Sequence, residues 1–363
     1  MPRIPRKIIK YVLVVLNVFS VLGMMACGYS IYFEPQHYPN LSYWGQAFPV
    51  FLVTTILFAI FWLFVRWRMA LISLAGLLLC IGSVRAYYPI NIPFSPPEGS
   101  IKFLSYNIQG MGRTSDGRDW RKAGVPWEET PIVLYLLTCG ADIVCCQEAG
   151  RINNEKVDPV LAEVYPHRMT LHFRNAYYSC LSRFPIIDGD SILFPSKGNG
   201  SVYYHLLIGK DTMLVVNNHF ESYKLKDDDK RDYKNILTQP EKEGTKEHID
   251  SLTHKLSNAS AIRGIQADMV DSLIARSTAK YIVACGDFND ASISYVHYRM
   301  TRHLNDAYTR SGNGPGFSYN RSGMYFRIDN ILCSDNITPY GAHVDSSIET
   351  SDHYPIYCWL SLE

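Results

Sequence analysis

Long apolar runs dominate the first part of the chain. Residues 11–33 carry no charged side chain, and a helix of that length, rising about 1.5 Å per residue, crosses a bilayer core of roughly 30 Å. A second uncharged run covers residues 47–65, and a third covers Met69–Val84, which could extend past Arg85 to Ile90 if that side chain reaches the headgroups. The pattern predicts a transmembrane anchor over residues 1–90 with about three spans, at 11–33, 47–65 and 69–87.

Two other interpretations of these runs stay open. Met69–Val84 is short for a span, so an interfacial hairpin is an alternative to the third crossing. The Ala26-Cys27-Gly28 stretch leaves lipoprotein-like cleavage as a minor alternative. A cleaved leader is less favoured, because further apolar runs follow the first one.

A different pattern follows the anchor. Residues 91–99 form a Pro-rich linker, and from residue 100 short β-like runs alternate with helical segments. Helices are predicted at Pro131–Thr138 and Ala259–Ala275. Buried strands are predicted at Ile101–Asn107, Asp142–Cys146, Met213–Asn217, Tyr281–Cys285, Ile328–Leu332 and Pro355–Leu360. Residues 100–363 are therefore expected to form one α/β domain.

Two segments of this domain need separate comment. Residues 223–258 are polar and lack sustained periodicity, which indicates a solvated insertion, with a lid over a neighbouring site as the alternative. The cysteines of the domain lie mostly in apolar, strand-like runs. That placement favours buried small side chains over a disulfide framework.

The apolar N-terminal part of the chain and the part that follows it also differ in net charge. Residues 1–87 hold seven basic groups and one acid, a net of +6, so the total of +1 leaves residues 88–363 at −5. An acidic domain lacks the basic surplus expected of a strong duplex binder. Basic residues gather at the N-terminus and at Arg66 and Arg68, whereas residues 34–46 contain none. Those basic ends are expected inside; three spans would then place the domain outside, whereas two would leave it in the cytoplasm.

Polar side chains recur where the predicted strands end. Carboxylates and amides at strand ends of an α/β sheet converge on one ligand crevice. Each motif alone is weak evidence, because a single Asn or Asp at a strand end is more often a turn residue. The motifs are Asn107, Gln147-Glu148, Asn217-Asn218-His219, Gly286-Asp287-Phe288-Asn289, Ile328-Asp329 and Ser351-Asp352-His353.

Taken in this order, these motifs resemble the signatures of the endonuclease/exonuclease/phosphatase superfamily of metal-dependent phosphoesterases. Ser182-Arg183-Phe184-Pro185 also looks like a segment of that family, and the resemblance spans residues 101–356. It implies a two-sheet, four-layer α/β sandwich for residues 100–363, preceded by the α-helical transmembrane segment. The anchor and residues 223–258 lie outside the resemblance.

The resemblance also implies roles for the site residues. Glu148, Asn107 and Asp352 would hold Mg²⁺, with Mn²⁺ as an alternative, since oxygen ligands suit a hard cation. The implied catalytic residues are His219, Asp287, Asn289, Asp329 and His353. Asp287 would orient or deprotonate the attacking water, Asn289 would hold a phosphate oxygen, and His353 would pair with Asp329.

The expected function is a membrane-anchored, divalent-metal-dependent phosphoesterase. It would hydrolyse phosphodiester or phosphomonoester bonds by in-line attack of water, with nuclease-like chemistry. A lipid head-group phosphodiesterase of the sphingomyelinase type and a catalytically silent membrane scaffold are the alternatives. The expected partners are the bilayer and a phosphoester substrate, whether nucleic acid, phospholipid head group or small phosphoester; no protein partner is inferable. The expected location is multi-pass in a bacterial inner membrane, with the catalytic domain in the periplasm.

Overall fold

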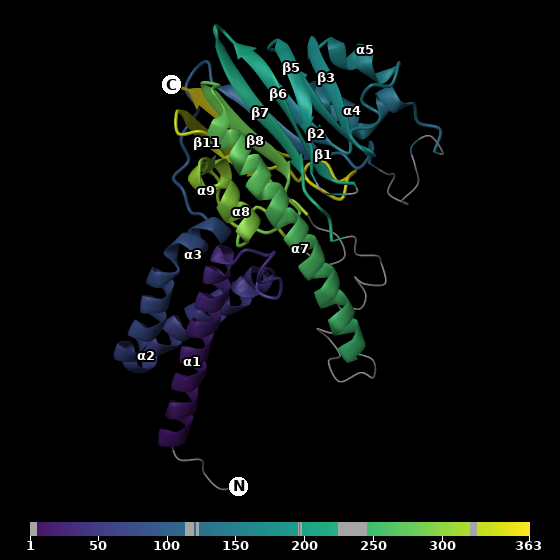
Figure 1. Cartoon of the computed structure of the whole chain (residues 1–363). Helices are drawn as coiled ribbons and strands as arrows, with labels where there is room; N and C mark the ends of the chain where they lie inside the picture. Colours follow the sequence, from purple (N-terminus) through teal and green to yellow (C-terminus); the bar gives the residue numbers. More distant parts are fainter. Residues whose placement is uncertain are drawn as a thin grey trace.

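Two six-stranded sheets pack face to face above a helical unit (Figure 1). The computed structural model describes residues 6–112, 120, 123–194, 196, 198–223, 245–319 and 325–363. The first sheet has the order β11 (Ile337–Val344), β12 (Ile356–Leu362), β1 (Ile101–Asn107), β2 (Ile143–Gln147), β4 (Ala176–Ser182), β3 (His167–Phe173). The second has the order β5 (Ile186–Ile192), β6 (Gly200–Ile208), β7 (Asp211–His219), β8 (Tyr281–Asp287), β10 (Asp329–Cys333), β9 (Asn305–Asp306). The predicted two-sheet α/β sandwich is confirmed.

The two sheets are built on the same plan. Each has one parallel pair near its centre, β1 with β2 and β7 with β8, and antiparallel strands on both sides. Parallel pairing brings the carboxyl ends of both strands to the same edge of a sheet. These two edges meet at one end of the sandwich, where the polar motifs lie.

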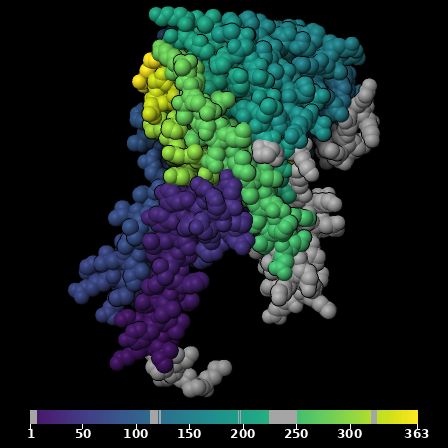
Figure 2. Space-filling model, in the orientation of Figure 1, coloured from purple at the N-terminus to yellow at the C-terminus, as the bar shows by residue number. Residues whose placement is uncertain are grey.

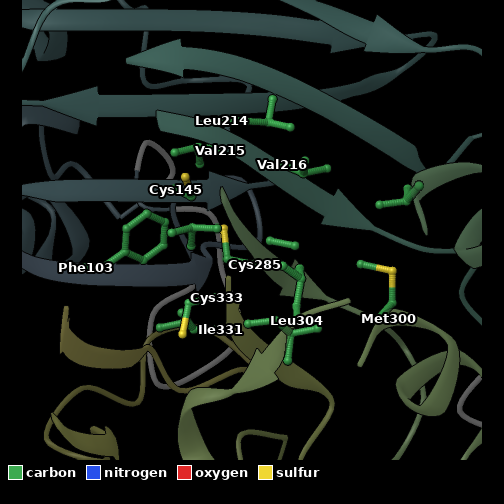
Figure 3. Close-up of a cluster of buried hydrophobic side chains, with 14 of the residues drawn as sticks. Phe103, Cys145, Leu214, Val215, Val216, Cys285, Met300, Leu304, Ile331 and Cys333 are labelled. Carbon is green, nitrogen blue, oxygen red and sulfur yellow. The ribbon is translucent and has the colours of Figure 1, made fainter. Parts of the chain in front are cut away.

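Alternation along the central strands supplies two apolar layers. In β1, Phe103 faces the layer between the sheets, while Leu104 and Tyr106 face the helices on the outer side. Figure 3 shows the layer between the sheets, where Phe103 and Cys145 lie close to Cys285. All nine cysteines are free, and those of the sheets are buried small side chains, as expected.

Helices cover the outer faces. The outer face of the first sheet packs against α4 (Pro131–Thr138) and α5 (Val157–Ala162), and the second sheet carries α7 (Thr245–Arg276), with α8 (Tyr295–Met300) and α9 (Ala307–Ser311) beside it. The α4 bounds agree with the prediction. The helix predicted at Ala259–Ala275 begins earlier, at Thr245. Of the predicted insertion 223–258, residues 224–244 lie outside the described residues and residues 245–258 are helical.

The N-terminal unit consists of α1 (Arg6–Tyr29), α2 (Phe48–Leu79) and α3 (Ile81–Tyr87), with short 3-10 turns at Ser30–Tyr32 and Trp44–Ala47. α2 is interrupted at Arg66, whose φ of −162° and ψ of 86° are not helical. Before the break it packs along α1, where Thr55 Oγ1 lies 2.9 Å from Ser20 Oγ. After the break it returns along α1, and the Tyr29 hydroxyl donates to the Leu79 carbonyl at 2.9 Å.

The span count needs correction. Among the described residues, two segments are long and apolar enough to cross a membrane, Lys7–Tyr32 and Trp44–Leu79, rather than about three. The third predicted run, 69–87, is divided between the end of α2 and the short α3, because the helix is broken at Cys80 (φ −99°, ψ 16°). Only 17% and 28% of the most apolar windows of the two segments are buried, so their side chains face outward.

A buried arginine of the sandwich, paired with an aspartate, also contacts the helical unit. Arg327 contacts Asp306 at 2.9 Å, and its guanidinium also donates to the Ala86 carbonyl of α3 at 2.9 Å. Burial alone raises the pKa of Asp306, but Arg327 and His297 outweigh it and hold the pKa well below the usual range. This stabilisation is present above the unfolded carboxyl pKa of about 3.9 and is lost as the pH falls below it.

Asp306→Asn should lower the free energy of unfolding by about 3 kcal/mol or more, because it leaves the Arg327 charge buried without its partner. Denaturant unfolding of the detergent-solubilised chain measures the change. The matched control is Asp211→Asn, which removes the exposed pair with Lys280 and should cost below about 1 kcal/mol. Equal losses in the two variants would contradict the role given to Asp306.

Candidate active site

Strand register brings the predicted site residues together. In the second sheet, Asp287 at the end of β8 is opposite His219 of β7 on one side and Asp329 of β10 on the other. In the first sheet, Asn107 at the end of β1 is opposite Gln147 of β2. The two ends face each other across the sandwich, so the convergence expected from strand ends is found in the geometry.

Buried amides connect the two sheets beneath the site. Gln147 Nε2 donates to Asn217 Oδ1 at 2.7 Å, and Asn217 Nδ2 donates to the Cys146 carbonyl at 3.1 Å. Nearer the surface, Asn107 Nδ2 lies 3.2 Å from Asp287 Oδ2. These contacts fix the position of one sheet relative to the other where the functional side chains emerge.

The Asp287 carboxylate is the centre of the arrangement. Its Oδ2 atom lies 3.2 Å from the side-chain nitrogens of Asn107 and Asn289, 3.5 Å from His219 Nε2 and 3.6 Å from His353 Nε2. Burial and the charge of Asp329 raise the pKa of Asp287, and the two histidines oppose that shift. A carboxyl with a raised pKa is suited to accepting a proton.

His353 is held on its other side by Asp329. Its Nδ1 lies 2.8 Å from Asp329 Oδ2, and both side chains are buried. Burial alone would lower the pKa of His353, but Asp329 and Asp287 outweigh it and hold the pKa well above the usual value. The Ser351 hydroxyl donates to the Asn107 carbonyl at 2.7 Å, which joins this loop to the first sheet.

Glu148 and Asn289 have backbone conformations uncommon for their residue types, with φ of 53° and 50°. Glu148 is 41% exposed, and its Oε1 lies 3.3 Å from Asn107 Nδ2 and 3.9 Å from His219 Nε2. The Asn289 side chain is fixed by donating to the Phe220 carbonyl at 3.0 Å. Strain of this kind is common at active sites, where it aims side chains into the cavity.

A cavity of about 310 Å³ opens above these residues. It is lined by every predicted site residue except Asp329, which lies behind His353. Asp352 contributes to the wall, and its charge is one of those that raise the pKa of His353.

The oxygen-rich side of the cavity fits a divalent cation. Glu148, Asp287 and Asp352 are among its lining residues, and no lysine or arginine is found among the lining residues that the structure describes. Carboxylate and amide oxygens are the ligands that Mg²⁺ prefers. The side-chain atoms of Asp287, Asp329 and His353 also lie within 4.8 Å of one another, but the Asp329–His353 hydrogen bond already occupies two of those groups.

Several features of the site were not predicted. Gln147 and Asn217 belong to the predicted motifs, but the hydrogen bond between them depends on how the two sheets pack, which the sequence does not show. Leu252 and Leu256 of α7, and Gln46 of the helical unit, also line the cavity. Their spacing in the sequence gives no signal for a site.

The fold and the site define a phosphoester hydrolase. A profile of the Endonuclease/Exonuclease/phosphatase family matches residues 104–353, and the chain belongs to this family, whose members depend on a divalent metal. Residues 7–87 match a domain of unknown function (DUF8431). No curated protein sequence matches the chain.

Solved structures are similar in fold. The human Nocturnin catalytic domain with bound sulfate is 16% identical, with a TM-score of 0.51, covering 75% of this chain and 97% of that chain. An endonuclease/exonuclease/phosphatase family protein from Bacteroides thetaiotaomicron is 17% identical, with a TM-score of 0.50, covering 74% and 97%. D. rerio TDP2 humanized by 14 mutations is 14% identical, with a TM-score of 0.50, covering 72% and 99%.

Glu148→Gln should weaken Mn²⁺ binding at least tenfold, because it removes a carboxylate charge from the oxygen-rich side of the cavity. Calorimetric titration of the metal-free chain with Mn²⁺ measures the affinity. Glu155→Gln, at an exposed position outside the cavity, is the matched control and should bind as the wild type does. Unchanged affinity in Glu148→Gln would remove this residue from the metal site.

Proposed function

We propose that the chain is a membrane-anchored, divalent-metal-dependent phosphoesterase that hydrolyses its substrate by in-line attack of water. The observation that carries the proposal is the Asp287 carboxylate, with two asparagines and two histidines within 3.6 Å of its Oδ2 atom. These side chains come from four separate segments of both sheets. Such a cluster can orient a water molecule and stabilise charge on a phosphoryl group.

Each catalytic residue has a role suited to its contacts. Asp287 orients the attacking water and accepts its proton, and Asn289 donates to a phosphoryl oxygen. His353, held as an imidazolium by Asp329, faces the phosphate. His219, which lies between Glu148 and Asp287, is placed to protonate the leaving oxygen.

The metal site is formed by Glu148, Asn107 and Asp352 at the same cavity. Mg²⁺, or Mn²⁺ in its place, supplies positive charge to the phosphoryl and leaving oxygens when bound. Asn107 lies next to Glu148, its Nδ2 being 3.3 Å from Glu148 Oε1, and it would ligate the cation through its amide oxygen. Asp287 thereby remains available to the water.

Asp287→Asn and His353→Ala should each lower kcat by about 10²- to 10⁴-fold on bis-p-nitrophenyl phosphate with Mg²⁺. The reason is that each removes a group that moves a proton or stabilises charge beside the phosphate. Steady-state rates of the full chain in detergent measure the loss.

The matched controls are Asp190→Asn and His37→Ala, at exposed positions away from the cavity. Both should retain wild-type kcat, and EDTA should abolish the activity of all five proteins. Wild-type turnover in Asp287→Asn or His353→Ala would remove that residue from the mechanism.

The outward-facing apolar helices support the membrane part of the proposal. Phe64 and Leu78 of α2 are 88% and 72% exposed, and Phe19 of α1 is 65% exposed. Surfaces of this kind are stable in lipid and unfavourable in water. We therefore assign residues 1–90 to the anchor, 91–99 to the linker and 100–363 to the catalytic domain.

The proposed orientation rests on where the basic residues lie. Thr55, before the break in α2, contacts Ser20 of α1, and Ser73, after the break, contacts Asn17 of α1. The segment Trp44–Leu79 therefore reverses at Arg66 and returns along α1, with Arg66 and Arg68 at the reversal. The sandwich lies at the other end of the helical unit, next to residues 34–46, which contain no lysine or arginine (Figure 1). With the reversal inside, the positive-inside rule favours an extracytoplasmic catalytic domain.

A C-terminal alkaline phosphatase fusion should therefore be active in bacterial cells, and a green fluorescent protein fusion at the same site should be dark. Both reporters depend on the compartment that the C-terminus reaches. Fusions at residue 68 should give the reverse pattern and act as the control. A fluorescent C-terminal fusion would overturn the orientation.

A further inference from the structure

The lining of the cavity above the catalytic cluster is apolar as well as polar. Leu252 and Leu256 of α7 are among its lining residues, as are Phe326 and Ile328; we call the two α7 leucines the α7 wall. Tyr319 also lines the cavity and packs against the catalytic His353, with ring centroids 5.3 Å apart. Phosphate transfer needs no apolar lining, so the α7 wall is available to a part of the substrate that carries no charge.

The lining also argues against a long polyanion. No lysine or arginine is found on this cavity's described lining, and residues 88–363 carry a net charge of −5. Nucleic-acid sites neutralise successive phosphates with lysine and arginine along the strand. The charge pattern suits a single phosphoryl group.

The helical unit contributes directly to the cavity. Gln46, in the turn between α1 and α2, is one of the lining residues, and its Nε2 donates to the Tyr223 hydroxyl at 2.8 Å. The buried Arg263 guanidinium packs on the Tyr223 ring, with Arg263 Cζ 4.1 Å from the ring centroid. The catalytic cavity is thus joined by hydrogen bonding to the end of the apolar helices.

Close backbone approach holds this junction in place. A Cβ atom on Gly45 would lie 1.8 Å from the Ile293 carbonyl oxygen, so any larger residue would push the helical unit away. Ile293 packs in one apolar cluster with Met24 and Phe48 of the helices. In the space-filling view the helical unit meets the sandwich beside α7 (Figure 2).

A second, polar groove adjoins the first cavity. It has a volume of about 640 Å³, includes Arg151, Asn175 and Tyr177, and shares Glu148 and His219 with the first cavity. The cavity that contains the α7 wall and the groove that contains Arg151 therefore meet at Glu148 and His219.

We propose that the substrate is a membrane phospholipid, with its apolar chain along the α7 wall and its polar head group in the groove beside Arg151. This inference rests on the proposed phosphoesterase function and adds the substrate class. Water forms a bond to phosphorus, the bond from phosphorus to the leaving alcohol oxygen breaks, and that oxygen takes up a proton. The products are a phosphomonoester and an alcohol, so atoms and charge balance without a further reactant.

The test uses p-nitrophenyl alkyl phosphodiesters with methyl and octyl chains, which share one scissile bond and differ only in apolar length. The full chain in detergent micelles with Mg²⁺ should show kcat/KM at least about tenfold higher for the octyl ester. That factor corresponds to burial of about two methylene groups. The p-nitrophenyl ester of a nucleoside 5′-phosphate is the third substrate; it has the same leaving group and should be hydrolysed less efficiently than the octyl ester.

Leu256→Asn separates the wall from simple enrichment of the octyl ester in micelles. It should lower the octyl-to-methyl ratio at least threefold, whereas Leu134→Asn, at an exposed leucine of α4, should keep the wild-type ratio. Thermal unfolding verifies that both variants fold. Since the micelles are the same, partitioning affects all three proteins equally.

The outcomes are distinct. A ratio that does not exceed one in the wild type, an unchanged ratio in Leu256→Asn, or faster hydrolysis of the p-nitrophenyl nucleoside ester than of the octyl ester would overturn the lipid assignment. In each of these cases, metal-dependent hydrolysis of the methyl ester that is lost in Glu148→Gln would leave the proposed function standing. Methyl-ester hydrolysis equal in the wild type and Glu148→Gln would refute the proposed function itself.

Discussion

The relative position of the two sheets is the constraint on which the site depends. An amide buried without a partner costs about 1–3 kcal/mol, so the fully buried Gln147 and Asn217 favour the one offset at which they bond to each other. That offset brings Asn107 of the first sheet to within 3.2 Å of Asp287 of the second. The polar contacts between the sheets therefore specify the active site as well as the packing.

This arrangement brings two buried carboxylates close together, and their mutual repulsion is destabilising. Asp287 and Asp329 are both buried beside His353, and Asp329 Oδ1 has no hydrogen-bond partner among the described residues. The site is stable because the imidazole contacts both carboxylates, and a bound cation would relieve the remaining repulsion.

The sequence predicts the site well because its residues follow the strands with the clearest patterns. Asn107, His219 and Asp287 each end a run of buried apolar residues, and parallel pairing makes such ends neighbours. The strands β3 to β6 were not predicted, because half-exposed segments such as His167–Phe173 have a mixed pattern. The break at Arg66 lies at the boundary predicted between the uncharged runs 47–65 and 69–87.

The long helix α7 joins the sandwich to the helical unit. The part of α7 that covers the second sheet contributes Ala267, Val270 and Ile274 to the core. This part lies within the helix predicted from the sequence at Ala259–Ala275. The earlier turns lie beyond the sheet, and they place Leu252 and Leu256 at the cavity, where Gln46 of the helical unit also lies. Apolar helix residues recur with the same spacing whether they face a cavity or a core, so the sequence alone does not show which of the two a given leucine faces. The helical unit and the extended part of α7 thus both contribute lining residues to the cavity, alongside those of the sandwich.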